Sequence, residues 1–376
     1  MTPKSETALA EAVKAAAAKR TPLHIKGGGT RAGLGVGVTG EVLNTSGLKG
    51  ISLYEPGALT IVAAAGTPLE TVEKTLAKEG QRLAFEPMDH RALYGTNGKP
   101  TIGGVVAANV SGPRRIQAGA CRDALIGVRF VDGEGTIVKN GGRVMKNVTG
   151  YDLVKLMAGS HGTLGVLTEV AFKVLPMPET SALVSIAGLD SARAVEAMSA
   201  ALTSPFDVTG AAHTAGKQPV TMVRVEGFEG SVTYRAGRLK ELLGRFGEVD
   251  VSLDDKANRQ AWENVRDVKR VADGDGDVWR ISVKPSDGPV VIAALSGAQV
   301  QMDWGGGLVW ARVPAGRDVR KGLRGIEGHA TLVRADEATK GKLGVFQPEQ
   351  PALAAISKGL RAKFDPFGIL NPGRMG

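Results

Sequence analysis

The chain has 376 residues, a formal net charge of +9 and a single cysteine, Cys121. One cysteine excludes an internal disulfide and a cysteine-held zinc or iron–sulfur site within the chain. The positive charge is spread along the chain without a polybasic block, and no apolar run reaches the roughly 18 residues of a membrane span, so we expect an anionic ligand or an acidic protein partner, no nucleic acid and no transmembrane segment.

Glycine accounts for 52 of the 376 residues, about twice its ordinary share of roughly 7%. Hydrophobic residues make up 43% and charged residues 23%, which is typical of a packed globular protein and not of a disordered one. In such a protein glycine is tolerated where the backbone turns tightly or approaches a ligand closely. The glycine clusters are therefore the first places to look for a site.

The first 90 residues predict the order helix, strand, glycine loop, strand, helix, strand. Ser5 and Thr67 are the expected N-caps of the two helices, and Gly80 is the expected end of the second. The expected bounds are 5–20, 23–25, 27–30, 59–65, 67–80 and 81–85.

Residues 95–178 predict a short helix after Gly104, a hairpin that turns at Asp132-Gly133, a second short helix and a half-buried strand. The last three are expected over 123–139, 151–158 and 166–174.

Residues 181–335 alternate strands and helices, as in an antiparallel sheet covered by helices on one face. The expected strands are 182–187, 219–226, 248–253, 278–284 and 308–313, and the expected helices are 191–202, 231–244 and 256–271. A helix over 348–363 and an extended tail over 364–373 follow, so the sequence predicts an α+β fold.

The loop from Gly27 to Thr30 follows a strand, and its three glycines allow backbone amides to point at an anion. It satisfies the loose G-x-G-x-x-G/A pattern, but the glycine-rich residues 32–40 cannot form the helix that a Rossmann motif requires. The loop is therefore either a phosphate site or a flexible hairpin. Lys26 and Arg31 flank it and either neutralise a pyrophosphate or are solvated.

Two further glycine segments leave two interpretations open. Gly103 and Gly104 precede a helical stretch, which indicates either an anion at the amides of residues 102–105 or close packing of a helix on a sheet. The segment from Gly159 to Val166 is either a loop against which a ligand presses or an ordinary connection.

The chain offers few residues for catalysis. None of its five histidines forms a metal pair or stands beside an obvious nucleophile. Cys121 is expected to be a buried structural thiol, and residues 273–277 lack the closing glutamate of a calcium loop. We therefore predict no metal site and assign no catalytic residue.

Four segments in order resemble the FAD-binding domain of the vanillyl-alcohol oxidase type, also called the PCMH type. Residues 22–30 and 101–112 resemble its first two cofactor loops, residues 147–153 with 162–170 resemble its third, and residues 364–373 resemble the tail that returns to the flavin domain. The resemblance implies a two-subdomain flavin domain over 1–178, a ferredoxin-like α+β domain over 179–345 and a returning C-terminal segment over 346–376.

The resemblance also assigns FAD contacts to these loops and the tail, where the glycines would clear space for the dinucleotide. The implied contact residues are Lys26, Gly27, Gly28, Gly29, Thr30, Arg31, Thr101, Gly103, Gly104, Ala107, Ser111, Gly112, Gly162, Thr163, Gly165, Val166 and Asn371. Thr30 stands where members with covalent FAD often carry histidine, so the FAD is expected to be non-covalent. Tyr151 and Asp152 lie either near the isoalloxazine or at a helix start.

Residues 111–115, 142–152 and 371–375 are similar to the E subunits of bacterial glycolate oxidases. That similarity implies oxidation of glycolate to glyoxylate in a complex with a second FAD subunit and an iron–sulfur subunit, to which electrons pass. Residues 1–20 lack the apolar segment of a signal peptide, so we expect a cytoplasmic protein that reaches the inner membrane only through partners.

The histidine pattern of catalytic relatives is incomplete in this chain. Catalytic relatives that act on 2-hydroxy acids carry paired histidines, of which the sequence keeps only His329. Two alternatives therefore remain: a self-sufficient FAD-dependent dehydrogenase of another 2-hydroxy acid, and a structural subunit without cofactor.

Overall fold

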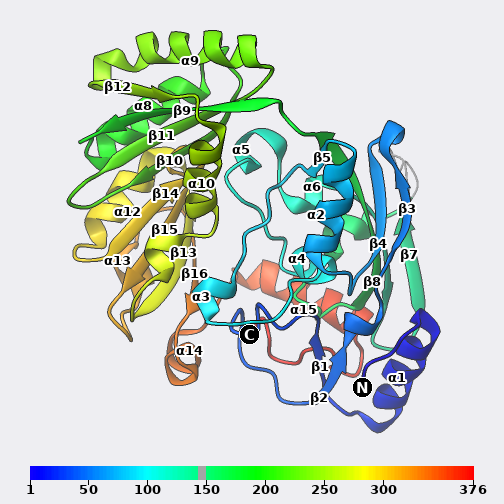
Figure 1. Cartoon of the computed structure of the whole chain (residues 1–376). Coiled ribbons are helices and arrows are strands. Elements are labelled where there is room, and N and C mark those ends of the chain that lie inside the picture. Colours follow the sequence, from blue (N-terminus) through cyan, green and yellow to red (C-terminus); the bar gives the residue numbers. More distant parts are fainter. Residues whose placement is uncertain (143–149) are drawn as a thin grey trace.

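The computed structural model describes residues 1–142 and 150–376. Its strands form three sheets: a parallel pair β1–β2, a six-stranded sheet of order β3-β4-β8-β6-β7 with β5 added beside β8, and an eight-stranded sheet of order β12-β9-β11-β10-β14-β15-β13-β16. Everything before β9 is called the N-terminal part below, and everything from β9 to α14 the C-terminal part. Figure 1 shows the two larger sheets on opposite sides of the molecule.

The N-terminal part is made of short elements joined by long loops. Its elements are α1 (Glu6–Lys19), β1 (Leu23–Lys26), β2 (Glu41–Asn44), β3 (Ile51–Glu55), β4 (Thr60–Ala64), α2 (Leu69–Lys78), β5 (Gln81–Leu83), α3 (Arg91–Tyr94), α4 (Ile102–Ala107), α5 (Arg115–Ala118), α6 (Cys121–Ala124), β6 (Leu125–Val131), β7 (Ile137–Gly141), α7 (Leu153–Met157) and β8 (Val166–Pro176).

The C-terminal part alternates strands and helices, and α15 then returns behind the N-terminal part (Figure 1). These elements are β9 (Thr180–Ala187), α8 (Ser191–Leu202), β10 (Val208–Thr214), β11 (Val220–Gly227), α9 (Glu229–Leu243), β12 (Val249–Ser252), α10 (Asp255–Arg266), α11 (Lys269–Ala272), β13 (Asp277–Val283), α12 (Gly288–Ala294), β14 (Gln299–Asp303), β15 (Leu308–Val313), α13 (Val319–Gly322), β16 (Gly328–Arg334), α14 (Glu337–Leu343) and α15 (Pro351–Phe364).

The two parts share one hydrophobic core. Phe85 and Ile102 of the N-terminal part belong to the same buried cluster as Trp304 and Trp310 of the C-terminal part. The opposite face of the eight-stranded sheet packs against α8 and α9 in a separate cluster. One face of this sheet is therefore directed at the N-terminal part, and its side chains can contribute to a site between the two.

The α+β class and most predicted elements are confirmed, and four details were wrong. Thr67 does not cap α2, because its hydroxyl instead exchanges hydrogen bonds with the backbone of Gly50. Helix α4 begins at Ile102, so both of its glycines lie inside the helix. The strand predicted over 81–85 ends at Leu83. Strands β2, β3, β10 and β14 were not predicted, so both larger sheets have more strands than expected and the pair β1–β2 was missed.

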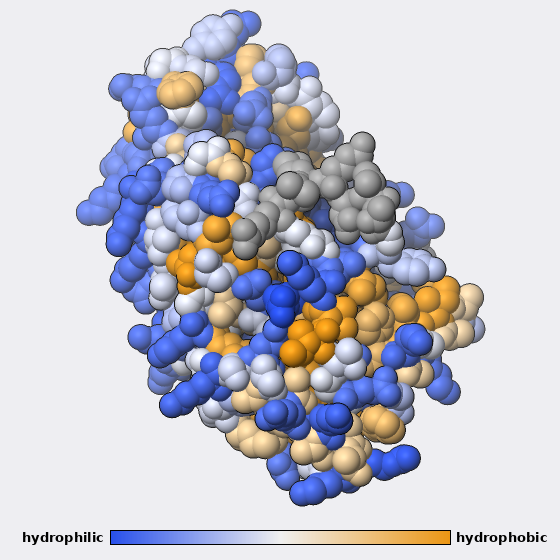
Figure 2. Space-filling model, turned by 90° about the vertical axis from the view of Figure 1, so that its right-hand side faces the viewer, coloured by the Kyte–Doolittle hydropathy of each residue, from blue (hydrophilic) through white to orange (hydrophobic). Residues whose placement is uncertain are grey.

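The tail closes the N-terminal part. Leu370 forms a parallel bridge with Leu23 at the start of β1, and both side chains lie in a small core with Leu9 and Leu43. Figure 2 shows that apolar residues gather in a band on the lower half of the face it draws. Helix α15 buries none of its residues and exposes Leu353 and Ile356 by 56% and 61%.

Candidate functional site

A cavity of about 110 Å³ lies where β1 ends. Its lining comes from β1 and the glycine loop, from α4, from His161 and from the tail. A second cavity of about 90 Å³ adjoins it and shares lining residues such as Gly27, Gly104 and Asn371. The four segments singled out in the sequence therefore meet at one place, although they are far apart along the chain.

Most of the predicted contact residues line these two cavities. They are Lys26, Gly27, Gly28, Gly29, Thr30, Arg31, Thr101, Gly103, Gly104, Ala107, Gly162, Gly165 and Asn371. The structure therefore brings these residues together around one pair of adjoining cavities.

The glycine loop offers unpartnered backbone donors. Within the described part of the chain, the amides of residues 28–32 donate to no acceptor. Consecutive backbone N–H groups in a loop form a concave anion site. The loop is therefore suited to a phosphate or diphosphate group, and it fits the diphosphate of a dinucleotide such as FAD.

Arg31 adds a positive charge to this wall. Its Nε donates to His90 Nδ1 at 3.3 Å and its Nη2 to the carbonyl of Met88 at 3.3 Å. Burial lowers the pKa of the Arg31 guanidinium to about 10, so it remains charged at neutral pH. Among the described residues no carboxylate oxygen lies within 4.0 Å of it, which leaves its charge available to an anion.

His90 is neutral and lies next to Arg31. Burial first, and the charge of Arg31 second, lower the pKa of His90 to about 3. Its Nδ1 lies 3.3 Å from Arg31 Nε and 3.2 Å from the carbonyl oxygen of Met88, so it accepts from Arg31 in the tautomer protonated on Nε2 and donates to Met88 in the other.

The amides of residues 102–105 do not bind an anion, contrary to one of the two expectations. Ile102 and Gly103 donate to the carbonyls of Thr67 and Ala65, at 3.0 and 2.8 Å. Gly104 donates to the hydroxyl of Thr101 at 3.3 Å, and Val105 donates to its carbonyl. The packing interpretation holds, because α4 lies against β4 and supplies an uncharged wall.

The glycines bring chain segments together rather than clearing space for a ligand. A Cβ on Gly28 would lie 1.5 Å from the carbonyl oxygen of Lys99. A Cβ on Gly103 would lie 2.7 Å from that of Ala65. The expectation that these glycines leave room for a dinucleotide was therefore wrong at these two positions, where they let the cavity walls approach each other.

Asn371 locks the tail into the cavity wall. Its Oδ1 accepts from the amide of Ile25 at 2.8 Å, and its Nδ2 donates to the carbonyl of His161 at 2.8 Å. A Cβ on Gly162 would lie 2.9 Å from that Nδ2, and Gly162 has φ +71°. A single buried amide thus joins β1, the third loop and the tail.

Four predicted contact residues do not line either cavity. The hydroxyl of Ser111 accepts from the amide of Cys121, and the carbonyl of Gly112 accepts from the indole of Trp304. The hydroxyl of Thr163 donates to the carbonyl of Ser160 at 2.7 Å. Val166 is fully buried in the core around β1. Their observed contacts are structural.

Two residues of the wall were missed by sequence reasoning. Arg374 donates from Nη2 to the carbonyl of Arg31 at 3.2 Å. His161 has φ +51° and meets the ring of Phe346 edge-on at 5.3 Å. Burial, with a smaller effect of Arg374, lowers the pKa of His161 to about 4. The basic residue in the tail motif was the available signal for Arg374.

The remaining predictions near the third cofactor loop concern Tyr151 and Asp152. Asp152 caps α7 by accepting from the amide of Lys155, as in the helix-start interpretation, and Tyr151 is 87% exposed. The part of the motif over 143–149 lies outside the described residues.

The described residues provide neither a cluster of metal ligands nor a membrane-spanning helix. In residues 1–142 and 150–376, no group of three or more histidine, cysteine, aspartate or glutamate side chains could hold a metal ion. No helix there has the length and apolar character needed to cross a membrane.

Comparisons with known proteins agree with this geometry. The model of the FAD binding domain family matches residues 1–141. Glycolate oxidase subunit GlcE of Escherichia coli (strain K12) is 38% identical over 370 residues, which cover 98% of this chain and 96% of that protein. Glycolate oxidase subunit GlcD of Bacillus subtilis (strain 168) is 36% identical over 163 residues, covering 43% of this chain and 33% of that protein.

Solved structures share the fold at low identity. Alkyldihydroxyacetonephosphate synthase matches with a TM-score of 0.71 and 15% identity, covering 99% of this chain and 76% of the other. Chitooligosaccharide oxidase matches with a TM-score of 0.66 and 17% identity, covering all of this chain and 90% of the other. These two likenesses concern the fold alone.

Proposed function

Because the chain belongs to the family of FAD-binding proteins that contains glycolate oxidase subunit GlcE, we propose that it is the FAD-binding E subunit of a glycolate-oxidising complex. The observation that carries this proposal is the cavity at the end of β1, where the free amides of residues 28–32 and the unpaired charge of Arg31 converge. When bound, FAD accepts two electrons from a substrate carbon.

The residues of this chain supply binding and orientation. The amides of residues 28–32, with Arg31 and Lys26, would hold the diphosphate of FAD. The attachment is proposed to be non-covalent, since Thr30 stands where members with covalent FAD often carry histidine. Asn371 fixes the wall of the cavity by joining three segments. The substrate proposed for the complex is glycolate, a 2-hydroxy acid, with glyoxylate as the product.

The proposed partners are a second FAD subunit and an iron–sulfur subunit. The single cysteine of this chain cannot ligate an iron–sulfur cluster, so the cluster of the proposed complex belongs to another chain. Helix α15 exposes Leu353 and Ile356 and also carries Lys358 and Lys363. It is therefore suited to contact one of these subunits at an apolar surface with acidic residues around it. The complex is proposed to be cytoplasmic and to reach the inner membrane through its partners.

The division of the chain follows the same proposal. Residues 1–178 form the flavin domain, residues 179–345 form the α+β domain that covers it, and residues 346–376 return to the flavin domain. The bridge between Leu23 and Leu370 supports the last boundary.

An absorption spectrum of the purified chain before and after acid precipitation tests the cofactor. We expect a flavin spectrum, with the flavin released into the supernatant. A colourless chain that cannot be loaded with FAD would contradict the proposal and support a structural subunit. Flavin retained in the pellet would contradict non-covalent binding.

The substrate is tested by adding glycolate without oxygen to the complex. We expect loss of the oxidised flavin absorption. If D-lactate or another 2-hydroxy acid bleaches the flavin while glycolate does not, the alternative of a dehydrogenase for a different hydroxy acid replaces the proposal.

A further inference from the structure

Two arginines lie against the ring of Trp304 where the N-terminal and C-terminal parts meet. Arg115, the first residue of α5, has its Cζ 4.4 Å from the ring centroid. Arg280, on β13, has its Cζ 5.2 Å from the same centroid. The flavin-binding part and the sheet opposite it thus each contribute one guanidinium to one aromatic ring.

Neither guanidinium has a counter-charge. In the part of the chain that the structure describes, no carboxylate oxygen lies within 4.0 Å of Arg115 or Arg280, and neither side chain forms a hydrogen bond. Asp123 acts on Arg115 only at longer range, and its Oδ2 already accepts from the amide of Ala120. Burial and the charge of Arg115 lower the pKa of Arg280 to about 10. Both groups therefore remain cations with unused donors at neutral pH.

Trp304 is held as a fixed platform. Its indole N–H donates to the carbonyl of Gly112 at 3.1 Å, and its amide donates to Asp303 Oδ1 at 2.7 Å. Its φ of +54° is unfavourable for a bulky side chain. Strain of this kind persists where the surroundings fix a residue, and it is common at functional sites. A guanidinium stacked on such a ring keeps its N–H edge free for a planar acceptor.

The pair lies beside the wall of the cofactor cavity. Burial first, and then the charges of Arg31 and Arg280, lower the pKa of His90, which lies 3.3 Å from Arg31 Nε, while Asp89 acts in the opposite direction. His329 on β16 stands opposite Ser282 of β13, two residues from Arg280. Burial and the charges of Arg280 and Arg115 lower the pKa of His329. Three carboxyl groups also lie in this region: Asp123 near Arg115, Asp89 near His90, and Asp303, whose pKa burial raises to about 7. Among the described residues none of them lies within 4.0 Å of either guanidinium.

We infer that Arg115 and Arg280, stacked on Trp304, bind the carboxylate of a small organic acid, and that this chain therefore has its own hydroxy-acid site. The inference rests on the proposed function, which supplies a 2-hydroxy acid as substrate. Hydrogen bonds from a guanidinium to a carboxylate are charge-assisted and among the stronger ones in proteins. Binding would also compensate two cations that are otherwise left partly desolvated without a partner.

The test is a titration of the purified full chain with oxalate, a two-carbon dicarboxylate, in a low-chloride buffer. Binding is measured by calorimetry, and in the flavin-loaded chain also by the shift of the flavin absorption. We expect Arg280→Gln and Arg115→Gln each to raise the Kd of oxalate by about tenfold or more, as the loss of a charge-assisted hydrogen bond predicts. Arg280→Lys, which keeps the charge, should lose less affinity.

The matched control is Arg193→Gln. Arg193 and Arg245 also share one aromatic ring, that of Phe246, at 5.2 and 4.9 Å, but Arg193 is about half exposed on α8. This variant should bind oxalate as the unmodified chain does. A purely structural role for Arg280 predicts a lower melting temperature in Arg280→Gln. Removal of an unpaired, partly buried cation predicts an unchanged or higher one.

The inference is overturned if the unmodified chain binds no oxalate, or if Arg280→Gln and Arg115→Gln bind it as tightly as Arg193→Gln does. Those results leave the proposed function intact when the chain still carries flavin. A chain that cannot be loaded with FAD but loses oxalate affinity in both variants would instead overturn the proposed function and keep the anion site.

Discussion

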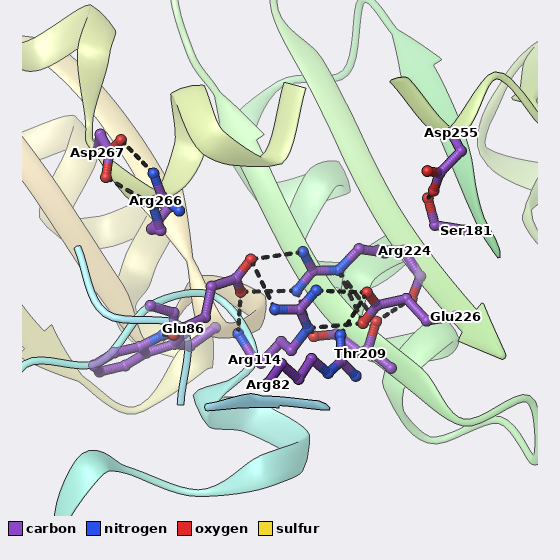
Figure 3. Close-up of polar contacts among 12 residues, drawn as sticks. Arg82, Glu86, Arg114, Ser181, Thr209, Arg224, Glu226, Asp255, Arg266 and Asp267 are labelled. Carbon is purple, nitrogen blue, oxygen red and sulfur yellow. Dashed lines mark hydrogen bonds and ion pairs between the residues drawn. The ribbon is translucent and has the colours of Figure 1, made fainter. Parts of the chain in front are cut away.

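Arg114 and Arg115 are neighbours in the sequence, yet their side chains enter opposite environments. The Nε of Arg114 donates to Glu226 Oε2 at 2.9 Å, and its Nη1 lies 3.2 Å from Glu86 Oε1 (Figure 3). Arg115 stacks on Trp304 without a carboxylate nearby among the described residues. One of two adjacent cations is thus used to hold the structure, and the next is left available to a ligand.

The first environment is a buried cluster of three arginines and two glutamates that joins the two parts of the chain. Arg224 of β11 forms two bonds of 3.0 Å with Glu86, and Arg82 of β5 lies 3.1 Å from Glu226. Burial opposes ionisation of Glu226, but Arg114, Arg224 and Arg82 outweigh it and hold the pKa of Glu226 well below its usual value. Every carboxylate oxygen in this paired cluster has a cationic partner.

The difference shows how to distinguish structural arginines from ligand-binding ones. A desolvated charge is costly unless it is paired, and the paired cluster meets this requirement within the chain. Among the described residues Arg31, Arg115 and Arg280 do not: Arg31 lines the proposed cofactor cavity, and Arg115 and Arg280 share the ring of Trp304. Pairing within the chain, rather than residue type, therefore separates the two roles.

The largest expected effect is a difference in stability between variants of Arg114 and of Arg115. Arg114→Gln leaves Glu86 and Glu226 short of a partner, so we expect the free energy of unfolding to fall by about 3 kcal/mol. Arg115→Gln removes no ion pair and should change it by less than about 0.5 kcal/mol. Urea denaturation of both variants measures the difference, and equal losses would contradict it.

The next effect concerns Arg31, the unpaired cation in the cavity wall. Arg31→Gln should raise the Kd of FAD by about tenfold to a hundredfold, because a charge-assisted contact to a phosphate is lost. The Kd is measured by the fluorescence of released flavin. Arg238→Gln, at an exposed ion pair with Glu241, is the control. Unchanged FAD affinity in Arg31→Gln would remove this residue from the site.

The smallest expected effect is the loss of the stability contributed by the paired cluster at acid pH. The folded-state pKa of Glu226 lies below its ordinary value of 4.5, so its contribution to stability is present above pH 4.5 and is lost as the pH falls below it. We expect the melting temperature of the unmodified chain to drop in that range more steeply than that of Glu226→Gln. Parallel pH profiles from differential scanning calorimetry would contradict the assignment.

The segments that line the cavity at the end of β1 could be singled out from the sequence, because each carries a local signal. Local sequence was enough to recognise the glycine loop after β1, the small-residue helix α4 and the tail motif that contains Asn371. The residues that join the segments could not. Arg374 and His161 act through contacts between distant parts of the chain, with Arg31 and Phe346.

The missed strands and the wrong anion site have similar causes. Strand β10 contains Gly210, Ala211 and Ala212, so it lacks the alternation of large apolar residues by which strands are recognised. The amides at the start of α4 appeared free in the sequence, but Ala65 and Thr67 supply their acceptors from another element. The different environments of Arg114 and Arg115 could not be predicted for the same reason, because Glu226 and Trp304 come from distant elements.

The lock formed by Asn371 has a consequence for the order of events during synthesis. The glycine loop leaves the ribosome early, but the wall that it needs is joined to β1 by a residue that follows more than three hundred others. Until Asn371 has emerged, the amide of Ile25 and the carbonyl of His161 lack their shared partner. A nascent chain therefore presents the flavin loop long before it has a complete pocket, and we expect tight cofactor loading to follow translation rather than accompany it.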